Sequence, residues 1–421
     1  MYRPYEFLLY PTKEQEQKLL VIREKCRLIY NECITTQREI WEKEKKVLKK
    51  FDLMKSARQK KTKPYMDISR TLISDMALRV DGGYQKFLSK KGGKPHYKKK
   101  GRQNSFTFID AGRNDGIAMV FQYENGKCKS LKNTKNLSSV VGRKLLRISG
   151  VGEIKIKLSQ DMEGDLKTIT IKYKNKKWYA IFTRANVEPD ILEKTGKEIG
   201  GDYGVSKLLT LSDGKVYEND RPLHKATFKL KNAQRDLSRK KKGSKRREKA
   251  KLILSKQHEK VARIRKDQHN KIANDLVKNY DFIGLEDLSV KKMLENDAPK
   301  SLHKSISDCG WRSLENTIVN KAQETGKTIV KVNPAHTSQD CFKCGNRVKK
   351  ELSERIHNCK VCGYIEDRDI NAAKNILKKA KKKYEEDTIK EQEKSLVAGA
   401  QPTSRFRKKK PITVKPSLTE M

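Results

Sequence analysis

The chain has 421 residues and a formal net charge of +45, from 97 Lys and Arg against 52 Asp and Glu. A charge excess this large is expected when the partner is a polyanion, which favours nucleic acid and argues against a small-molecule substrate. No run of 18 apolar residues is present, so we expect no membrane partner. The N-terminus has no signal-peptide pattern, and an intracellular, reducing location would keep the eight cysteines out of disulfides.

The N-terminal half predicts a β domain that is interrupted by helices. Residues 1–11 alternate as a strand, residues 12–92 show helical spacing of apolar side chains, and residues 93–190 return to a period of two after a Gly-rich basic linker. Two alternating runs flank Asn175 and Lys176, which predicts a β-hairpin. We therefore expect residues 1–11 to join the sheet formed by residues 93–190.

The C-terminal half predicts an α+β domain over residues 196–336. Two strands are followed by helices over residues 222–280, broken near Gly243, and then by a strand, a helix and a last strand. Residues 367–383 predict a final helix. Residues 384–421 are polar and Lys-rich, and we expect a flexible basic tail there. The fold class is thus multidomain α+β.

Four cysteines between the last strand and the last helix have the spacing C-x2-C-x14-C-x2-C. Two such pairs can place four thiolates around one Zn²⁺, and a closed set of four cysteines indicates a structural ion. We expect one zinc within residues 337–366; four unrelated thiols are the alternative. The predicted ligands are Cys341, Cys344, Cys359 and Cys362.

Three carboxylates occur where the predicted elements begin or end. Asp202 and Glu286 lie at the ends of apolar strands, and Asp369 opens the last helix. An acidic residue in an apolar strand is unfavourable to bury without a metal or a partner. This arrangement is typical of a site for two Mg²⁺ ions in phosphodiester cleavage. Each residue taken alone could instead cap a turn or a helix.

Helical spacing separates Asp369 from its neighbour Asp367. The residues three, four and seven positions after Asp369 are Ala372, Ala373 and Ile376, an apolar face that should pack on the sheet. The same positions after Asp367 form a mixed, more polar set. We therefore predict that Asp369 points towards Asp202, whereas Asp367 serves the helix start.

A dense basic run lies at the break between the two long helices, over residues 239–251. A solvated helix face is the alternative, but the basic character of the whole chain favours contact with a nucleic-acid backbone. The residues concerned are Arg239, Lys240, Lys241, Lys242, Lys245, Arg246 and Arg247.

These residues and their surroundings resemble the TnpB nucleases of bacterial insertion sequences, which are related to compact type V CRISPR effectors. The resemblance spans nearly the whole chain and is most specific in GGDYGVSKLLTLSDG, IGLEDL, VNPAHTSQDCFKCG and CGYIEDRDINAAKNIL. It implies an N-terminal β-barrel (wedge) interrupted by a helical recognition lobe. It also implies a RuvC-like RNase H fold with an inserted zinc ribbon, in which Asp202, Glu286 and Asp369 are the catalytic triad.

The activity implied by the resemblance is RNA-guided cleavage of double-stranded DNA beside a short adjacent motif. The guide RNA would derive from the transposon end, and the protein would be cytoplasmic and associated with the nucleoid when bound to DNA. Three alternatives stay open: a compact type V CRISPR effector, an RNA-guided regulator that does not cut, and a transposase that acts without RNA. The presence of all three carboxylates argues against the regulator.

Overall fold

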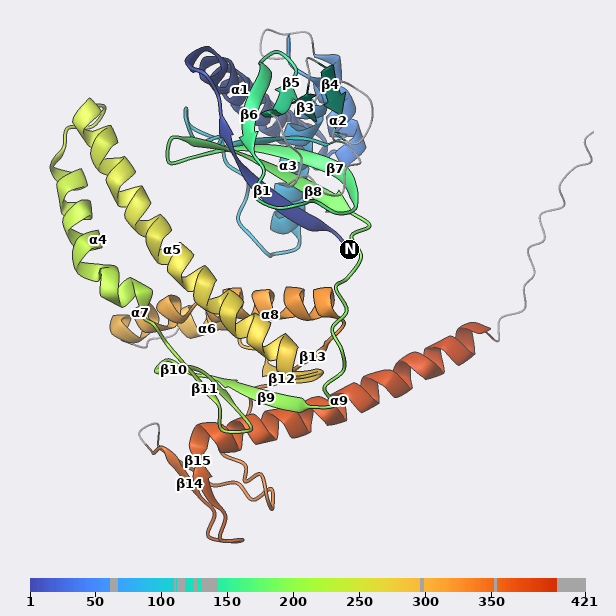
Figure 1. The fold of residues 1–421 in the computed structure, drawn as a ribbon, viewed down its shortest axis with the longest axis vertical. Coiled ribbons are helices and arrows are strands. Elements are labelled where there is room, and N and C mark those ends of the chain that lie inside the picture. Colours follow the sequence, from blue (N-terminus) through green and yellow to red (C-terminus); the bar gives the residue numbers. More distant parts are fainter. Residues whose placement is uncertain are drawn as a thin grey trace, which may run out of the picture. The chain divides into compact units, whose positions relative to one another are not determined.

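The computed structural model divides the chain into two compact units, Met1–Pro189 and Asp190–Met421. Each unit has its own hydrophobic core. In the described part of the chain, no helix is long and apolar enough to cross a membrane. The structure (Figure 1) describes residues 1–60, 67–109, 111, 118–124, 127–130, 143–295, 299–351 and 354–399.

The first unit contains an eight-stranded antiparallel sheet in the order β2-β7-β8-β1-β6-β5-β3-β4. Strand β1 lies between β8 and β6, which confirms that the N-terminal strand belongs to this sheet. Within the described residues β2 and β4 are the edges, so the described strands form a half-barrel, the part of the expected β-barrel that the structure shows. The strands are β1 (Arg3–Tyr10), β2 (Ser105–Phe108), β3 (Ala118–Glu124), β4 (Lys127–Ser130), β5 (Arg143–Ile148), β6 (Gly152–Lys157), β7 (Asp165–Lys174) and β8 (Lys177–Ala185).

The predicted hairpin joins β7 to β8 through Asn175 and Lys176. Both residues have positive φ, 50° and 61°, which is the geometry of a type I′ turn. This turn matches the right-handed twist of the two strands and so fixes their register, in which Tyr173 pairs with Trp178.

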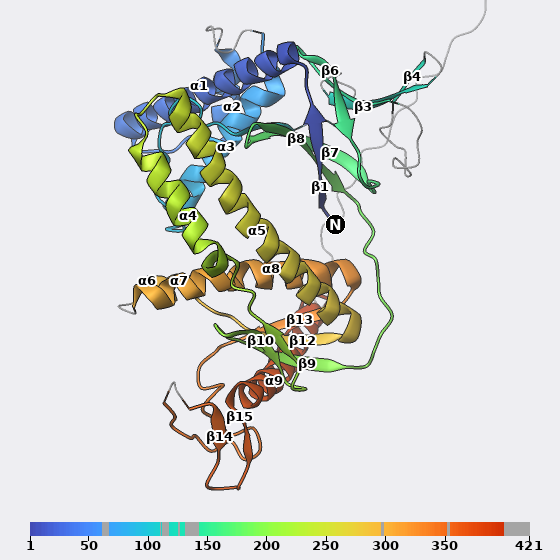
Figure 2. The ribbon, with the colours of Figure 1, turned by 60° about the vertical axis from the view of Figure 1, so that its left-hand side comes forward.

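Three helices follow β1 before the chain returns to the sheet: α1 (Lys13–Glu44), α2 (Lys50–Gln59) and α3 (Arg70–Leu88). Helix α1 begins at a capping box in which Thr12 and Gln15 satisfy each other's backbone amides. Cys26 and Cys33 are buried in the core of this unit and act as small apolar side chains. Figure 2 shows the three helices grouped together beside the sheet. The sequence predicted helices in this segment of the chain.

The second unit contains a five-stranded sheet in the order β11-β10-β9-β12-β13. Strand β12 is parallel to β9 and β13, whereas β10 is antiparallel to β9 and β11. The strands are β9 (Glu198–Tyr203), β10 (Lys207–Leu211), β11 (Val216–Glu218), β12 (Phe282–Glu286) and β13 (Thr328–Val332).

Helices cover both faces of this sheet. Apolar residues of α5 and α8 pack on one face, and those of α9 pack on the other, as Figure 1 shows above and below the sheet. The helical region breaks at Gly243, with φ of 86°, as predicted. The helices are α4 (Pro222–Arg239), α5 (Lys245–Asn279), α6 (Val290–Glu295), α7 (Lys300–Cys309), α8 (Trp311–Thr325) and α9 (Arg368–Gly399).

The predicted end of the last helix at residue 383 is wrong. Helix α9 continues to Gly399, so the expected flexible tail does not begin at residue 384. The continuation, residues 384–399, is rich in Glu, also contains Lys, Gln, Leu and Ala, and has no Pro, which favours helix even without an apolar stripe. Residues 400–421, the rest of the predicted tail, lie outside the described residues.

Candidate functional site

Asp202 and Glu286 lie side by side at the carboxyl ends of neighbouring parallel strands. The last paired residues of β9 and β12 are Gly201 and Leu285, so Asp202 and Glu286 occupy the next position on each strand. Residues at the same register position point to the same face, here the face covered by α9. The sheet therefore brings together two carboxylates that are 84 residues apart in sequence (286 − 202).

Two glycines bring α9 unusually close to this face. Gly200 and Gly284 are register partners, each two residues before a carboxylate. A Cβ on Gly200 would lie 2.0 Å from the carbonyl oxygen of Ala373, and one on Gly284 would lie 2.8 Å from the Cβ of Ala380. The backbone of α9 thus occupies the space that side chains at these two strand positions would fill.

This close packing also places Asp369. Ala373 lies over Gly200, and Asp369 precedes it by about 6 Å, one helical turn. Asp202 lies beyond Gly200 by two strand residues, which is roughly the same distance. Since α9 runs antiparallel to β9, with Lys381 paired to Glu198 at the other end, Asp369 starts the helix at the edge that carries Asp202.

The neighbouring carboxylates at this edge disfavour the charged form of Asp202. Burial raises the pKa of Asp202 well above its usual value, and the carboxylates of Glu286 and Asp369 raise it further. Burial also raises the pKa of Glu286, whose side chain is only 5% exposed, although the Thr337 hydroxyl donates to it at 2.7 Å. Bound cations would relieve this repulsion, so the residues present fit a Mg²⁺ site of hard oxygen ligands.

Asp367 has the helix-capping role that the spacing predicts. Its Oδ1 accepts hydrogen bonds from the backbone amides of Asp369, at 2.8 Å, and Ile370, at 3.2 Å. Burial acts to raise the pKa of Asp367, but these amides and Lys207 bring it below the usual value. Ala373 and Ile376 are fully buried, which confirms the face of α9 that packs on the sheet.

The four cysteines form one compact cluster. The Sγ atoms of Cys341 and Cys362 are 3.6 Å apart, as are those of Cys344 and Cys359, and all four lie within 4.8 Å of one another. Tetrahedral Zn–S bonds of about 2.3 Å imply S···S distances of roughly 3.8 Å, so the sulfurs fit a zinc ion. Among the described residues no other set of three or more Cys, His, Asp or Glu ligand atoms is gathered this closely.

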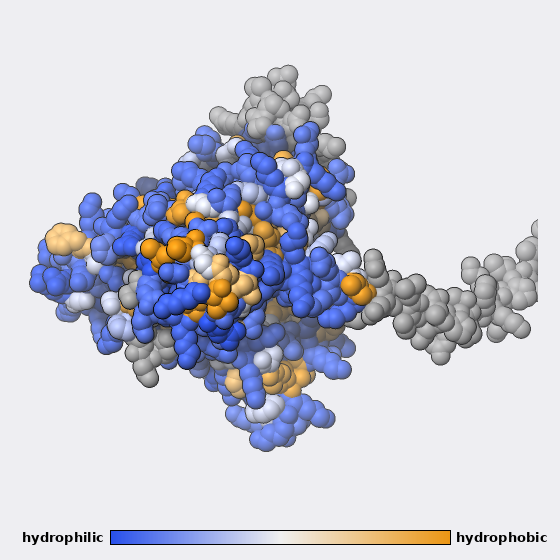
Figure 3. Space-filling model, turned by 90° about the horizontal axis from the view of Figure 1, so that it is seen from below, coloured by the Kyte–Doolittle hydropathy of each residue, from blue (hydrophilic) through white to orange (hydrophobic). Residues whose placement is uncertain are grey.

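The two cysteine pairs share the same backbone geometry. A glycine with positive φ follows each pair, Gly345 at 78° and Gly363 at 68°, and its amide donates to the carbonyl of the first cysteine at 2.8 Å. The second pair is flanked by strands β14 (Ile356–Asn358) and β15 (Ile365–Asp367), which leads directly into α9. Figure 3 views the molecule from below the orientation of Figure 1, where β14 and β15 lie, and it shows hydrophobic residues exposed among the hydrophilic ones on this face.

Family models match three parts of the chain. Residues 182–297 match a family described as "Probable transposase", and residues 311–376 match a "Cas12f1-like, TNB domain". Residues 1–46 match a "Helix-turn-helix domain", although in the structure they form strand β1 and the single helix α1.

Relatives extend these matches to nearly the full length. The chain is 28% identical over 391 residues to "Putative RNA-guided DNA endonuclease InsQ" of Escherichia coli (strain K12), covering 89% of this chain and 91% of the relative. It is 29% identical over 224 residues to "TnpB-like protein L79" of Acanthamoeba polyphaga mimivirus, covering 50% of this chain and 43% of that protein. The chain is therefore similar, over nearly its full length, to a relative named as an RNA-guided DNA endonuclease, and over half its length to a protein named TnpB-like.

The fold of the chain is also similar to that of a solved CRISPR-associated protein. A solved Cas12f1–sgRNA–target DNA complex matches it with a TM-score of 0.56 at 16% identity, covering 87% of this chain and 83% of that one. At this identity the likeness concerns the fold alone.

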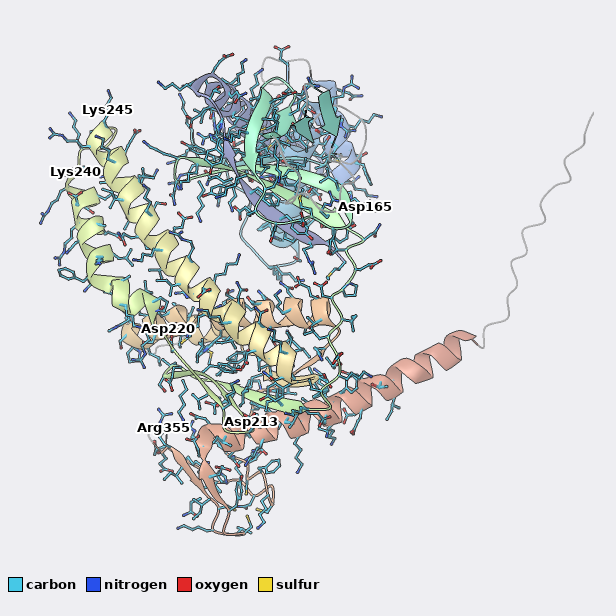
Figure 4. The ribbon with its side chains drawn as sticks, viewed as in Figure 1. Asp165, Asp213, Asp220, Lys240, Lys245 and Arg355 are labelled. Atoms are coloured by element: carbon cyan, nitrogen blue, oxygen red, sulfur yellow. The ribbon has the colours of Figure 1, made fainter. Side chains whose placement is uncertain are left out.

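The predicted basic residues lie at the turn between α4 and α5. Figure 4 shows Lys240 and Lys245 at the tip of this hairpin, at the end far from the sheet. Arg247 differs from the others, because its guanidinium donates to the carbonyls of Leu237, at 2.6 Å, and Lys240, at 2.9 Å. Arg247 therefore closes the end of α4. The exposed members of the run are Arg239, Lys241, Lys242, Lys245 and Arg246.

Two buried asparagines of α9 were missed by the sequence analysis. Asn371 exchanges hydrogen bonds with the backbone of Asp340 and Phe342, at 2.9 and 3.0 Å. Asn375 donates to the carbonyl of Thr337 at 2.9 Å. These bonds tie the start of the cysteine segment to α9, and Thr337 in turn holds Glu286. The available signal was two asparagines beside the apolar residues Ala372, Ala373 and Ile376 of α9.

Proposed function

We propose that this protein is a member of the TnpB family and an RNA-guided DNA endonuclease of the kind encoded by insertion sequences. The observation that carries the proposal is the convergence of Asp202, Glu286 and Asp369 on one edge of the second sheet. Three antiparallel strands followed by two parallel ones, with helices on both faces, is the order expected of a RuvC-like RNase H fold. The cysteine segment between β13 and α9 is then the inserted zinc ribbon.

Asp202, Glu286 and Asp369 are the residues that would hold two Mg²⁺ ions. When bound, such a pair supplies an activated water and stabilises the leaving oxygen of the phosphodiester. The carboxylates of Glu286 and Asp369 both raise the pKa of Asp202, so Asp202 lies near both. It would therefore be the residue that serves both ions. Thr337 orients Glu286, and the cap at Asp367 fixes the helix start that carries Asp369.

The cysteine cluster would hold one structural Zn²⁺. A closed set of four thiolates leaves no position for a substrate, so this ion would act on the fold rather than on the reaction. Through Asn371 and Asn375 the ribbon is bonded to the helix that carries Asp369. Loss of zinc would therefore weaken the support of the carboxylate edge.

The exposed residues at the tip of the α4–α5 hairpin would contact a nucleic-acid backbone. Such contacts carry affinity without sequence information, which suits a protein whose target is selected by base pairing with a guide. We propose that this guide RNA derives from the transposon end and that the target is double-stranded DNA beside a short motif.

A compact type V CRISPR effector is the second candidate, favoured by the match to the Cas12f1-like TNB domain over residues 311–376. The two candidates share one chemistry and differ in the source of the guide. A transposon end beside the gene supports the first, and a CRISPR array supports the second. A transposase would cut its own ends without any RNA.

The test is cleavage of a plasmid by the purified complex with its co-purifying RNA, which is first sequenced. Wild type should cut only plasmids that match the guide, and only with Mg²⁺. Asp202→Ala, Glu286→Ala and Asp369→Ala should each abolish cutting while guide and target binding persist. Cutting that ignores the guide would contradict the proposal, as would full activity of any of the three variants.

A further inference from the structure

A lysine that the proposed mechanism has not used lies at the carboxylate edge, which is the end of the second sheet where Asp202, Glu286 and Asp369 meet. The ammonium nitrogen of Lys207, at the start of β10, is 3.3 Å from Oδ2 of Asp367 and 3.9 Å from Oδ2 of Asp369. Its side chain is 33% exposed, so the ammonium group is accessible from outside.

A β-bulge turns Lys207 towards this edge. Along β10 and β11 the register shifts, with Leu209 opposite Tyr217 but Lys207 opposite Glu218, so that Leu208 is the extra residue. Leu208 and Leu209 are both fully buried in the core on the α5 and α8 side of the sheet.

Without a bulge, alternation would point Lys207 into the same core as Leu209. The extra residue reverses this, and Lys207 joins the face of Thr210, which is the register partner of Asp202. Bulges recur beside active sites because they re-aim a side chain in this way.

We propose that Lys207 is a further catalytic residue, whose ammonium binds a non-bridging oxygen of the phosphate to be cut. This inference rests on the nuclease function proposed above. A phosphate that approaches Asp202, Glu286 and Asp369 meets an anionic edge, and a fixed cation there would stabilise its charge. An ammonium has three donors, and the hydrogen bond to Asp367 uses one of them.

A purely structural ion pair would behave differently. Lys207 and Asp367 are both about one-third exposed, at 33% and 34%, and ion pairs this exposed contribute little to stability. Lys215 offers a matched control on the same sheet, because it pairs with Asp275 at 2.5 Å and is 43% exposed. Lys215 lies beyond the opposite end of β10, and its ammonium bonds to Asp275 of α5.

The experiment compares guide-loaded Lys207→Met, Lys207→Arg and Lys215→Met with wild type. Single-turnover cleavage should fall about 10²-fold in Lys207→Met, the loss typical of one removed donor to transition-state charge. Lys207→Arg should recover part of that loss, and Lys215→Met should cut like wild type. Target binding should stay within twofold in every variant.

Titration with Mn²⁺, followed by its electron paramagnetic resonance signal, separates phosphate binding from metal binding. Lys207→Met should bind Mn²⁺ at least as tightly as wild type, since it loses a repelling charge. Cleavage within twofold of wild type would overturn the inference, as would a loss of Mn²⁺ binding in parallel with cleavage. If wild type binds its target without cutting it, the proposed nuclease function fails, and the role of Lys207 fails with it.

Discussion

The close packing of α9 against Gly200 gives a sharp prediction about how the catalytic edge is built. Gly200→Ala adds one methyl group to β9, at a residue whose φ suits any amino acid. That methyl would lie 2.0 Å from the carbonyl oxygen of Ala373 and 2.8 Å from the backbone nitrogen of Leu377. Ordinary contacts between carbon and oxygen are about 3.3 Å, so α9 must move away from the strand by roughly 1 Å.

Two consequences follow from this displacement. Overpacking of this kind costs about 1–3 kcal/mol, and each kcal/mol lowers the melting temperature of a domain of this size by about 2–4 °C. Because Asp369 is carried by α9, the same movement separates it from Asp202. A misplacement of about 1 Å at reacting groups costs on the order of 10²-fold in rate. Gly200→Ala should therefore be folded, moderately less stable and nearly inactive.

The neighbouring glycine provides the control. A methyl on Gly201 would meet only the ends of leucine side chains, Leu209 at 3.0 Å and Leu285 at 3.1 Å, on the opposite face of the sheet. These ends can shift, so Gly201→Ala should melt within a few degrees of wild type and keep most of its cleavage. Thermal unfolding and single-turnover cleavage measure both effects. Equal rates for the two variants would refute the role assigned to the helix contact.

Three further predictions concern the metal sites and the hairpin. Elemental analysis should find about one zinc per chain, and its removal by a chelator should lower both the melting temperature and cleavage; a chain that folds and cuts without zinc would contradict a structural ion. Asp369→Ala should abolish Mg²⁺-dependent plasmid cleavage, whereas Asp367→Ala should keep substantial activity and lose about 1 kcal/mol of stability; the reverse pattern would show that the roles are exchanged. Neutralising Lys241 and Lys245 should each remove roughly 0.7–0.9 from the slope of log affinity against log salt, while Arg247→Ala should mainly lower the melting temperature; unchanged slopes would indicate a solvated face.

The sequence predicted most elements of the second unit because their signals are local. Helix α8 and the break at Gly243 follow from apolar spacing and a glycine, and the start of α9 follows from the spacing around Asp369. Helices α6 and α7 were missed, since they are short and α6 has no buried residue. The continuation of α9 was missed because its signal is propensity without periodicity.

Residues whose role depends on contacts between distant segments could not be recognised in advance. Lys207 looks like an ordinary surface lysine until the register shift beside β11 turns it towards Asp369. Arg247 belongs to a charge run, and only the hairpin geometry shows that its guanidinium bonds the end of α4. The strand that carries Glu286 was visible in the sequence, whereas its hydroxyl partner, Thr337, was not.

The catalytic edge gathers several residues that each violate a local preference. Gly200 and Gly284 weaken the strands they occupy, since glycine gives a strand neither stiffness nor side-chain packing. Glu286 is a buried carboxylate, and Asn371 is a buried amide at the start of α9. Each of these residues alone lowers the stability of the fold, yet each brings a backbone segment or a polar group to the same edge of one sheet. When independent violations converge on one place, function explains them better than folding does, and here they converge where Asp202 and Asp369 meet.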